Sequence, residues 1–216
     1  MIEASAINQK LRKHQHMFTG CQAPTEIADN LQKILRPWNV KVRTLRSADI
    51  PTQAFSVGGS FDLEIRRNNI EIDLYFSPRQ RKLIWFDDKI ENFMFLVSQV
   101  LQHELIHRYQ NSSRPADVQQ LATYYNIVTR RERDQSEVDY LSEFDEIDAY
   151  AHDIALEIYY YYPGQDALDI LRTISKRRKL YSWNMYKRAF RNCDDWSLVK
   201  HRLLGKVYRW LPYITF

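Results

Sequence analysis

The sequence predicts an α+β fold, in which an N-terminal helix and a small antiparallel sheet precede two long helices and a helical C-terminal part. Alternating apolar and polar residues between positions 61 and 76 predict the sheet. Two stretches without Pro or Gly, residues 90–109 and 143–158, repeat apolar residues at helical spacing. With 216 residues and 44% hydrophobic content, the chain can bury a substantial core.

The first elements follow from local signals. Pro24 and Thr25 open a helix that ends before Pro37. The apolar residues that follow, Val40, Val42 and Leu45, predict a strand.

The clearest strand signal is a hairpin. Residues 61–66 and 70–76 both alternate apolar and polar side chains, and Asn68-Asn69 lies between them as a two-residue turn. A further short strand, residues 82–86, leads into Asp87 and Asp88, which are suited to cap a helix. The sheet therefore leads directly into the first long helix.

That helix carries the most informative motif of the chain, His103-Glu104-Leu105-Ile106-His107. Positions four apart lie on one face of a helix, so both imidazoles can bind one metal ion while Glu104 lies beside it. Two neutral nitrogen ligands, an open coordination position and an adjacent carboxylate are what a hydrolytic zinc site needs. The motif predicts one Zn²⁺ per chain with His103 and His107 as ligands and Glu104 as general base.

A third protein ligand is expected from the second long helix. Glu143, Asp145 and Glu146 stand near its start, and His152 lies further along it. Solvated helix faces are also rich in acids, so residue type alone leaves the choice among these four open.

At these two helices the chain resembles the gluzincins, zinc metallopeptidases whose His-Glu-x-x-His helix faces a second helix with a glutamate ligand. Glu146-Ile147-Asp148-Ala149 matches the Glu-x-x-Ala pattern of several small soluble branches, with Tyr150 where these often have Asp or Asn. The resemblance covers the two helices and little else. It implies a zincin-like active-site helix pair with Glu146 as the third ligand, whereas a ligand at His152 would look more like the SprT-type proteases.

The activity that this resemblance implies is hydrolysis of peptide bonds in a protein or peptide substrate. The metzincins are a different class, because they would have Gly and His where this chain has Gln110 and Ser113. In gluzincins an edge strand pairs with the extended substrate, a role for which residues 82–86 or one strand of the hairpin are the alternatives.

Further residues near the predicted site have supporting roles. Asp153 follows Glu146 by seven residues and so returns to nearly the same helix face, where it is suited to orient a zinc-binding histidine. Gluzincins commonly stabilise the oxyanion with a tyrosine or histidine, and Tyr140, Tyr150 and His152 are the alternatives here.

The segment between the two long helices contains two different patterns. Residues 118–128 form an apolar patch that predicts a helix. The charged run of residues 130–135 after it predicts an exposed loop.

The last part of the chain is distinctly basic. Residues 163–216 hold twelve Lys and Arg against four Asp and Glu, a net charge of +8, so residues 1–162 carry −4 of the total of +4. We expect a zincin-like core over residues 1–162 and a basic, aromatic-rich helical extension over 163–216 that packs on it within one structural domain. Cations mixed with aromatic residues also suit nucleic acid or another polyanion. The alternative function is a non-catalytic, metal-stabilised protein that binds nucleic acid or a large assembly through this part.

The two cysteines and the absence of apolar segments bear on location. Cys21 and Cys193 have no Cys or His at metal-ligand spacing and are expected to be free thiols in a reducing compartment, with a single disulfide as the alternative. The N-terminus lacks the apolar stretch of a secretory signal, and nowhere do eighteen apolar residues run together. We expect a cytoplasmic protein without membrane contact, of bacterial or bacteriophage type, located in the host cytoplasm in the latter case.

Overall fold

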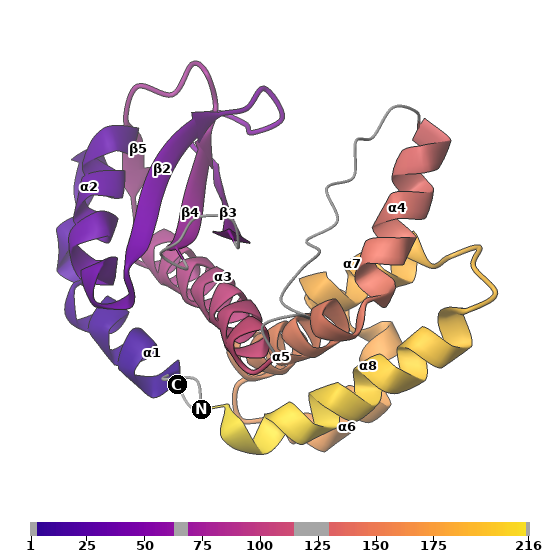
Figure 1. Cartoon of the computed structure of the whole chain (residues 1–216). Helices are drawn as coiled ribbons and strands as arrows, with labels where there is room; N and C mark the ends of the chain where they lie inside the picture. The colour runs from indigo at the N-terminus through magenta and orange to yellow at the C-terminus, as the bar shows by residue number, and fades with distance from the viewer. Residues whose placement is uncertain (1–3, 63–68, 115–129, 215–216) are drawn as a thin grey trace. The chain divides into compact units, whose positions relative to one another are not determined.

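The computed structural model describes residues 4–62, 69–114 and 130–214 (Figure 1). It has the predicted α+β class, with helices and strands before residue 87 and only helices among the described residues after it. The chain divides at residues 109 and 110 into two compact units.

In its described residues, the first unit contains a three-stranded sheet and a two-stranded one. Their strands are β1 (Gly20–Gln22), β2 (Val40–Arg46), β3 (Phe55–Asp62), β4 (Asn69–Phe76) and β5 (Leu83–Trp85). The larger sheet has the order β2-β4-β3, and β1 pairs with β5. The predicted antiparallel pairing holds for β3 with β4 and for β1 with β5. β2 is parallel to β4, because β3 reverses the chain direction before β4 enters between them.

The hairpin differs from the predicted one in its register. β3 begins at Phe55 rather than near Phe61, and Asn69 pairs with Asp62 as the first residue of β4. The prediction of Asn68-Asn69 as a two-residue turn is therefore wrong for Asn69. Residues 63–68, which include the rest of the predicted first strand, lie outside the described residues.

Helices of the first unit enclose the buried face of the sheet. They are α1 (Ala4–Lys13), α2 (Pro24–Leu35) and α3 (Asp87–Ser112), together with the 3-10 turns Gln15–Phe18 and Arg36–Trp38. α2 begins at Pro24 as predicted, and the Glu26 carboxylate accepts a hydrogen bond of 2.7 Å from the Ala23 N–H at its start. α2 packs along β2 (Figure 1).

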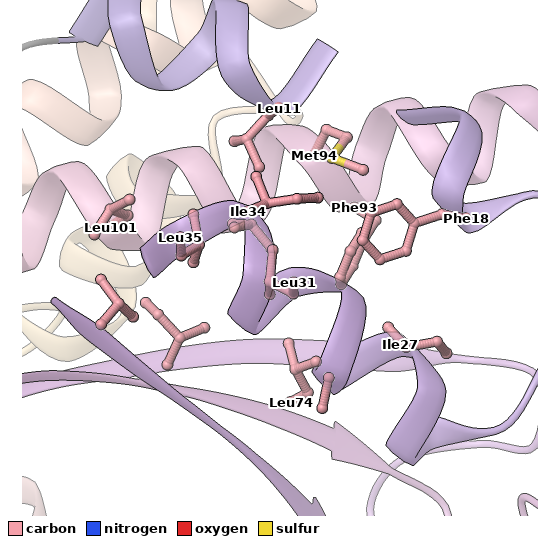
Figure 2. Close-up of a cluster of buried hydrophobic side chains, with 14 of the residues drawn as sticks. Leu11, Phe18, Ile27, Leu31, Ile34, Leu35, Leu74, Phe93, Met94 and Leu101 are labelled. Atoms are coloured by element: carbon pink, nitrogen blue, oxygen red, sulfur yellow. The ribbon is translucent and has the colours of Figure 1, made fainter. Parts of the chain in front are cut away.

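Side chains from α1, α2, β4 and α3 form one apolar core (Figure 2). Leu31 and Ile34 of α2 meet Leu74 of β4 and Phe93 of α3 there, all of them buried. Burial of each such side chain contributes about 1.5–3 kcal/mol. This core fixes one side of α3, which runs for 26 residues and carries the His-Glu-x-x-His motif.

The second unit is helical in its described residues. Its elements are α4 (Arg130–Ser142), α5 (Phe144–Tyr161), α6 (Ala167–Arg172), α7 (Tyr181–Ala189) and α8 (Trp196–Trp210), with the 3-10 turns Ile174–Lys176 and Leu211–Tyr213. α5 packs against both α7 and α8. The second long helix of the prediction is therefore confirmed as α5, and the basic segment supplies the helices that cover it.

One local prediction in this unit is wrong. The charged run of residues 130–135 forms the first turns of α4 instead of a loop. Arg, Glu and Gln are good helix formers, and this propensity prevails although the run has no apolar stripe. The helix predicted over residues 118–128 lies outside the described residues.

Two whole-chain expectations can be compared with the structure. No helix of the described part is long and apolar enough to cross a membrane. Cys21 and Cys193 are both free, as predicted, with Cys21 exposed and Cys193 partly buried. The compartment remains a prediction.

Candidate metal centre

The two histidines of the motif converge on one point beside α3. The Nε2 atoms of His103 and His107 lie 3.0 Å apart, and their ring centroids are 4.8 Å apart. Two nitrogen ligands at about 2.05 Å from a tetrahedral Zn²⁺ would be about 3.3 Å apart. The helix therefore brings both nitrogens close to ligand spacing without any rearrangement of the backbone.

A buried polar network holds the preceding turn of α3. Ser98 Oγ donates to Asn8 Oδ1 of α1 at 2.5 Å, and Gln102 Nε2 donates to Ser98 Oγ at 2.8 Å. Buried polar groups of this kind favour one arrangement of the elements that they join. His103 thus directly follows Gln102, which is fully buried and is linked to α1 through Ser98.

Glu104 lies beside the histidines and is only 7% exposed. Within the same unit, Gly59 of β3 comes close to it: a Cβ built on Gly59 would lie 3.0 Å from both Cγ and Oε1 of Glu104. Sequence reasoning missed Gly59. The available signal is that Phe55, Val57 and Phe61 alternate around Gly59, which marks a strand with one position on its apolar face left without a side chain.

The three carboxylates near the start of α5 that were alternatives for the third ligand differ in their exposure and in their partners. Glu143 is the exposed N-cap, and Asp145 pairs with Arg114. Glu146 is buried, with 7% of its surface exposed. At the same point the Gln110 side chain, near the C-terminal end of α3, donates to the Asp145 carbonyl at 3.2 Å.

The first unit supplies two of the expected ligand atoms, the Nε2 atoms of His103 and His107. The second unit supplies the expected third ligand, Glu146, which is the buried carboxylate at the start of α5. Two imidazole nitrogens and one carboxylate oxygen form a donor set that Zn²⁺ accepts in hydrolytic sites.

Comparisons with protein-family models, curated proteins and solved structures found no match. No family is thereby assigned to the chain.

Asp153 and Tyr150 lie on the same side of α5 as Glu146. All three raise the pKa of Tyr186 in α7, although burial of Tyr186 is the larger cause. The Tyr150 and Tyr186 rings are in edge contact, with centroids 5.6 Å apart. This arrangement agrees with the expected return of Asp153 to the Glu146 face, whereas its contact with a zinc-binding histidine stays a prediction.

His152 occupies a different side of the helix. Six residues at about 100° each place it roughly 120° around α5 from Glu146. Its buried ring packs edge-on against Trp210 of α8, with centroids 4.9 Å apart, and its Nδ1 lies 4.0 Å from Asp153 Oδ1. This location disfavours His152 as the oxyanion donor and leaves Tyr150 and the partly buried Tyr140 of α4 as alternatives.

The two strands considered for substrate binding differ in their edges. One edge of β5 pairs with β1. On its other edge, Gln53 Nε2 donates to the Lys82 carbonyl at 3.0 Å, and the Ile84 N–H donates to Gln53 Oε1 at 2.9 Å. Lys89 Nζ donates to the Ile84 carbonyl at 3.0 Å. The β5 edge is therefore occupied, whereas β3 is the outer strand of its sheet and pairs only with β4 among the described strands.

Proposed function

We propose that this chain is a zinc-dependent metallopeptidase with His103, His107 and Glu146 as metal ligands and Glu104 as general base. The observation that carries the proposal is the convergence of the His103 and His107 Nε2 atoms, 3.0 Å apart, with the buried carboxylate of Glu104 next to His103. We propose Glu146 as the third ligand because it is the buried carboxylate at the start of α5. Mg²⁺ and Ca²⁺ prefer sites made of oxygen ligands alone, so the donor set favours zinc.

When bound, Zn²⁺ would supply a polarised scissile carbonyl and a water whose pKa is lowered to about 7. Glu104 would accept the proton of the attacking water and then deliver it to the amine leaving group. Its low exposure keeps bulk water away from the carboxylate, which strengthens its interaction with a nearby proton donor. Tyr150 or Tyr140 would donate a hydrogen bond to the developing oxyanion.

The substrate we propose is an extended segment of a protein or peptide. β3 is the strand suited to bind it, because its outer edge is not used by another described strand and Gly59 lies beside Glu104. Strand addition binds a peptide through its backbone and so tolerates varied side chains.

The test is a metal titration combined with an assay of peptide cleavage. We expect the metal-free protein to bind one Zn²⁺ per chain and to melt at a higher temperature when zinc is added. At a zinc concentration a thousand times Kd, binding should raise the free energy of unfolding by about 4 kcal/mol. Glu146→Gln should reduce this stabilisation strongly. Glu104→Gln should retain zinc and lower kcat by about 10²–10⁴ in a broad peptide library.

Two matched variants serve as controls for the third ligand. Glu143→Gln and Asp145→Asn change neighbouring carboxylates in the same turn and should leave zinc affinity near the wild-type value. Equal losses in all three variants, or loss of zinc in Glu104→Gln, would contradict the assignment of ligands and base.

A second function, binding of nucleic acid, has one specific observation in its favour. Arg202, Gly205 and Arg209 of α8 are exposed and lie on one face of the helix, with Tyr208 beside them 59% exposed. A Cβ built on Gly205 would meet nothing within 4 Å, so packing does not require a glycine there. This basic stripe, defined by Arg202, Gly205, Tyr208 and Arg209, is suited to a single strand that pairs its phosphates with arginine and stacks a base on tyrosine.

A further inference from the structure

Gly59 of β3 lies against α3 beside the proposed base. A Cβ built on Gly59 would lie 2.5 Å from Val100 Cγ1, and 3.0 Å from Cγ and Oε1 of Glu104. Val100 and Glu104 are four residues apart and share one face of α3. Any side chain at position 59 would therefore enter the space that these two side chains occupy.

The same face of β3 carries large apolar residues elsewhere. Phe55, Val57 and Phe61 alternate with outward-facing positions and pack against the core. Glycine in a strand interior weakens the strand, by roughly 0.5–1 kcal/mol relative to alanine, and often marks a close approach of another group. Among these positions of β3, only position 59 has no side chain, and it is the position that lies against Glu104.

The two neighbours of Gly59 on α3 differ in how they can yield. Val100 is β-branched and has one strongly preferred rotamer in a helix, so its methyl groups cannot turn away easily. Glu104 is unbranched and can rotate. An added methyl group would therefore push β3 away from Val100 unless that side chain is shortened, whereas its contact with Glu104 can be relieved by a displaced carboxylate.

We propose that Gly59 is a positioning residue for Glu104, because the missing side chain lets β3 confine the carboxylate beside the two histidines. This inference rests on the proposed function for the role of Glu104, and on the described residues of the first unit alone for its geometry. Gly59 does not contact the reacting atoms; it acts through the carboxylate that it confines.

Gly58 provides a matched control. It is the preceding residue of β3 and faces the opposite side of the sheet, where a built Cβ would lie 3.2 Å from Cε2 of Tyr75. Gly58→Ala and Gly59→Ala therefore make the same chemical change one residue apart, against Tyr75 in one case and Glu104 in the other.

The first measurement needs no metal. Crystal structures of metal-free wild type, Val100→Ala, Gly59→Ala/Val100→Ala and Gly58→Ala should show the Glu104 carboxylate displaced in Gly59→Ala/Val100→Ala only, with the β3 backbone in its wild-type position. The Val100→Ala background is used because truncation of Val100 removes the closest clash and leaves the Glu104 contact. A Glu104 that keeps its wild-type rotamer in Gly59→Ala/Val100→Ala, or a β3 that moves outward there, would overturn the proposal.

The second measurement uses zinc-loaded protein and acetohydroxamate, a chelator whose hydroxyl proton needs an acceptor beside the metal. We expect Gly59→Ala to bind zinc within twofold of wild type and acetohydroxamate at least about tenfold more weakly, a change of about 1.4 kcal/mol. In a Glu104→Gln background, Gly59→Ala should cause no additional loss. The double variant with Val100→Ala should recover unfolding free energy without recovering acetohydroxamate affinity.

The results separate the two ideas. An equal loss of acetohydroxamate affinity from Gly59→Ala with Glu104 present or replaced would refute the positioning role and leave the metallopeptidase proposal intact. A wild-type protein that binds no zinc would refute the proposed function, while the crystal structures would still decide whether Gly59 confines Glu104.

Discussion

At the scale of single residues, the phenol of Tyr186 lies near the acidic side chains Glu146 and Asp153 of α5. Tyr186 is fully buried, and its hydroxyl donates to the Leu141 carbonyl at 3.0 Å. Burial raises the pKa of Tyr186 well above its usual range, and the nearby Tyr150, Glu146 and Asp153 raise it further. The folded protein therefore holds this proton more tightly than the unfolded chain does.

This difference predicts a loss of stability at high pH. The contribution of a neutral Tyr186 is fully present below the unfolded pKa of about 10 and is lost as pH rises above it, with a slope of up to about 1.4 kcal/mol per pH unit. Tyr186→Phe should lower the free energy of unfolding by about 1 kcal/mol at neutral pH, because the hydrogen bond is lost. Above pH 10 the free energy of unfolding of this variant should fall less steeply than that of the wild type. Urea unfolding at a series of pH values between 8 and 11 measures both effects.

Two other tyrosines provide the comparison. Burial raises the pKa of the half-buried Tyr161 to about 12, and Glu157 and Tyr160 add to this shift, so Tyr161→Phe should also reduce the alkaline slope. Tyr181 is 72% exposed, and Tyr181→Phe should follow the wild-type curve. Equal slopes for wild type and Tyr186→Phe would show that the buried phenol is not a main source of alkaline instability.

Residue-level prediction from the sequence succeeded where the pattern is local. The motif places His103 and His107 on one helix face by spacing alone, and their nitrogens converge as that spacing requires. The contact of Gly59 with Glu104 joins residues far apart in the chain, so no local pattern reveals it. Likewise Glu146 differs from Asp145 in burial and in its partners, which the sequence does not display.

At the scale of elements, α7 depends on a capping group from another helix. Its N-cap residue, Leu180, provides no side-chain hydrogen bond. The Glu157 carboxylate of α5 takes this role: its Oε1 accepts from the Ser182 N–H at 3.1 Å and from Ser182 Oγ at 2.8 Å. A carboxylate at the start of a helix also interacts favourably with the helix dipole.

Replacement of this carboxylate should destabilise the packing of α7 on α5. We expect Glu157→Gln to lower the free energy of unfolding by about 1–3 kcal/mol, because a buried, charge-assisted acceptor is lost. Ser182→Ala should have a smaller effect, since the backbone N–H can still donate to Glu157. Urea denaturation measures these changes, and Glu143→Gln, at the exposed N-cap of the same α5 helix, should change stability by less than about 0.5 kcal/mol. A similar loss in Glu143→Gln and Glu157→Gln would contradict the capping role.

The elements also show which sequence signals are sufficient. Helical spacing without Pro or Gly was enough to identify α3 and α5. β3 was placed too late, because Gly58 and Gly59 interrupt the alternation that marks a strand. The parallel pairing of β2 with β4 depends on which strand enters between which, and local patterns carry no information on strand order.

At the scale of the whole molecule, charge is distributed unevenly along the chain. Residues 163–216 carry a net charge of +8, against −4 for the remainder. An uneven distribution of this kind attracts polyanions to one part of a protein and raises association rates at low salt. The basic stripe of α8 is the part of this segment where two exposed arginines share a helix face and an exposed tyrosine lies beside that face.

A single-stranded oligonucleotide tests this surface by fluorescence anisotropy over a range of salt concentrations. Arg202→Glu/Arg209→Glu should weaken binding and reduce the slope of log K against log salt by about 1.4, because each phosphate contact on a single strand contributes about 0.7. Arg79→Glu/Arg81→Glu changes the net charge equally at exposed positions of the first unit. If net charge alone attracts the oligonucleotide, both double variants should lose the same affinity. If α8 is the binding surface, only Arg202→Glu/Arg209→Glu should lose affinity. Tyr208→Ala adds a term independent of salt, since stacking of a base on an aromatic ring releases no counterions and contributes about 1–3 kcal/mol.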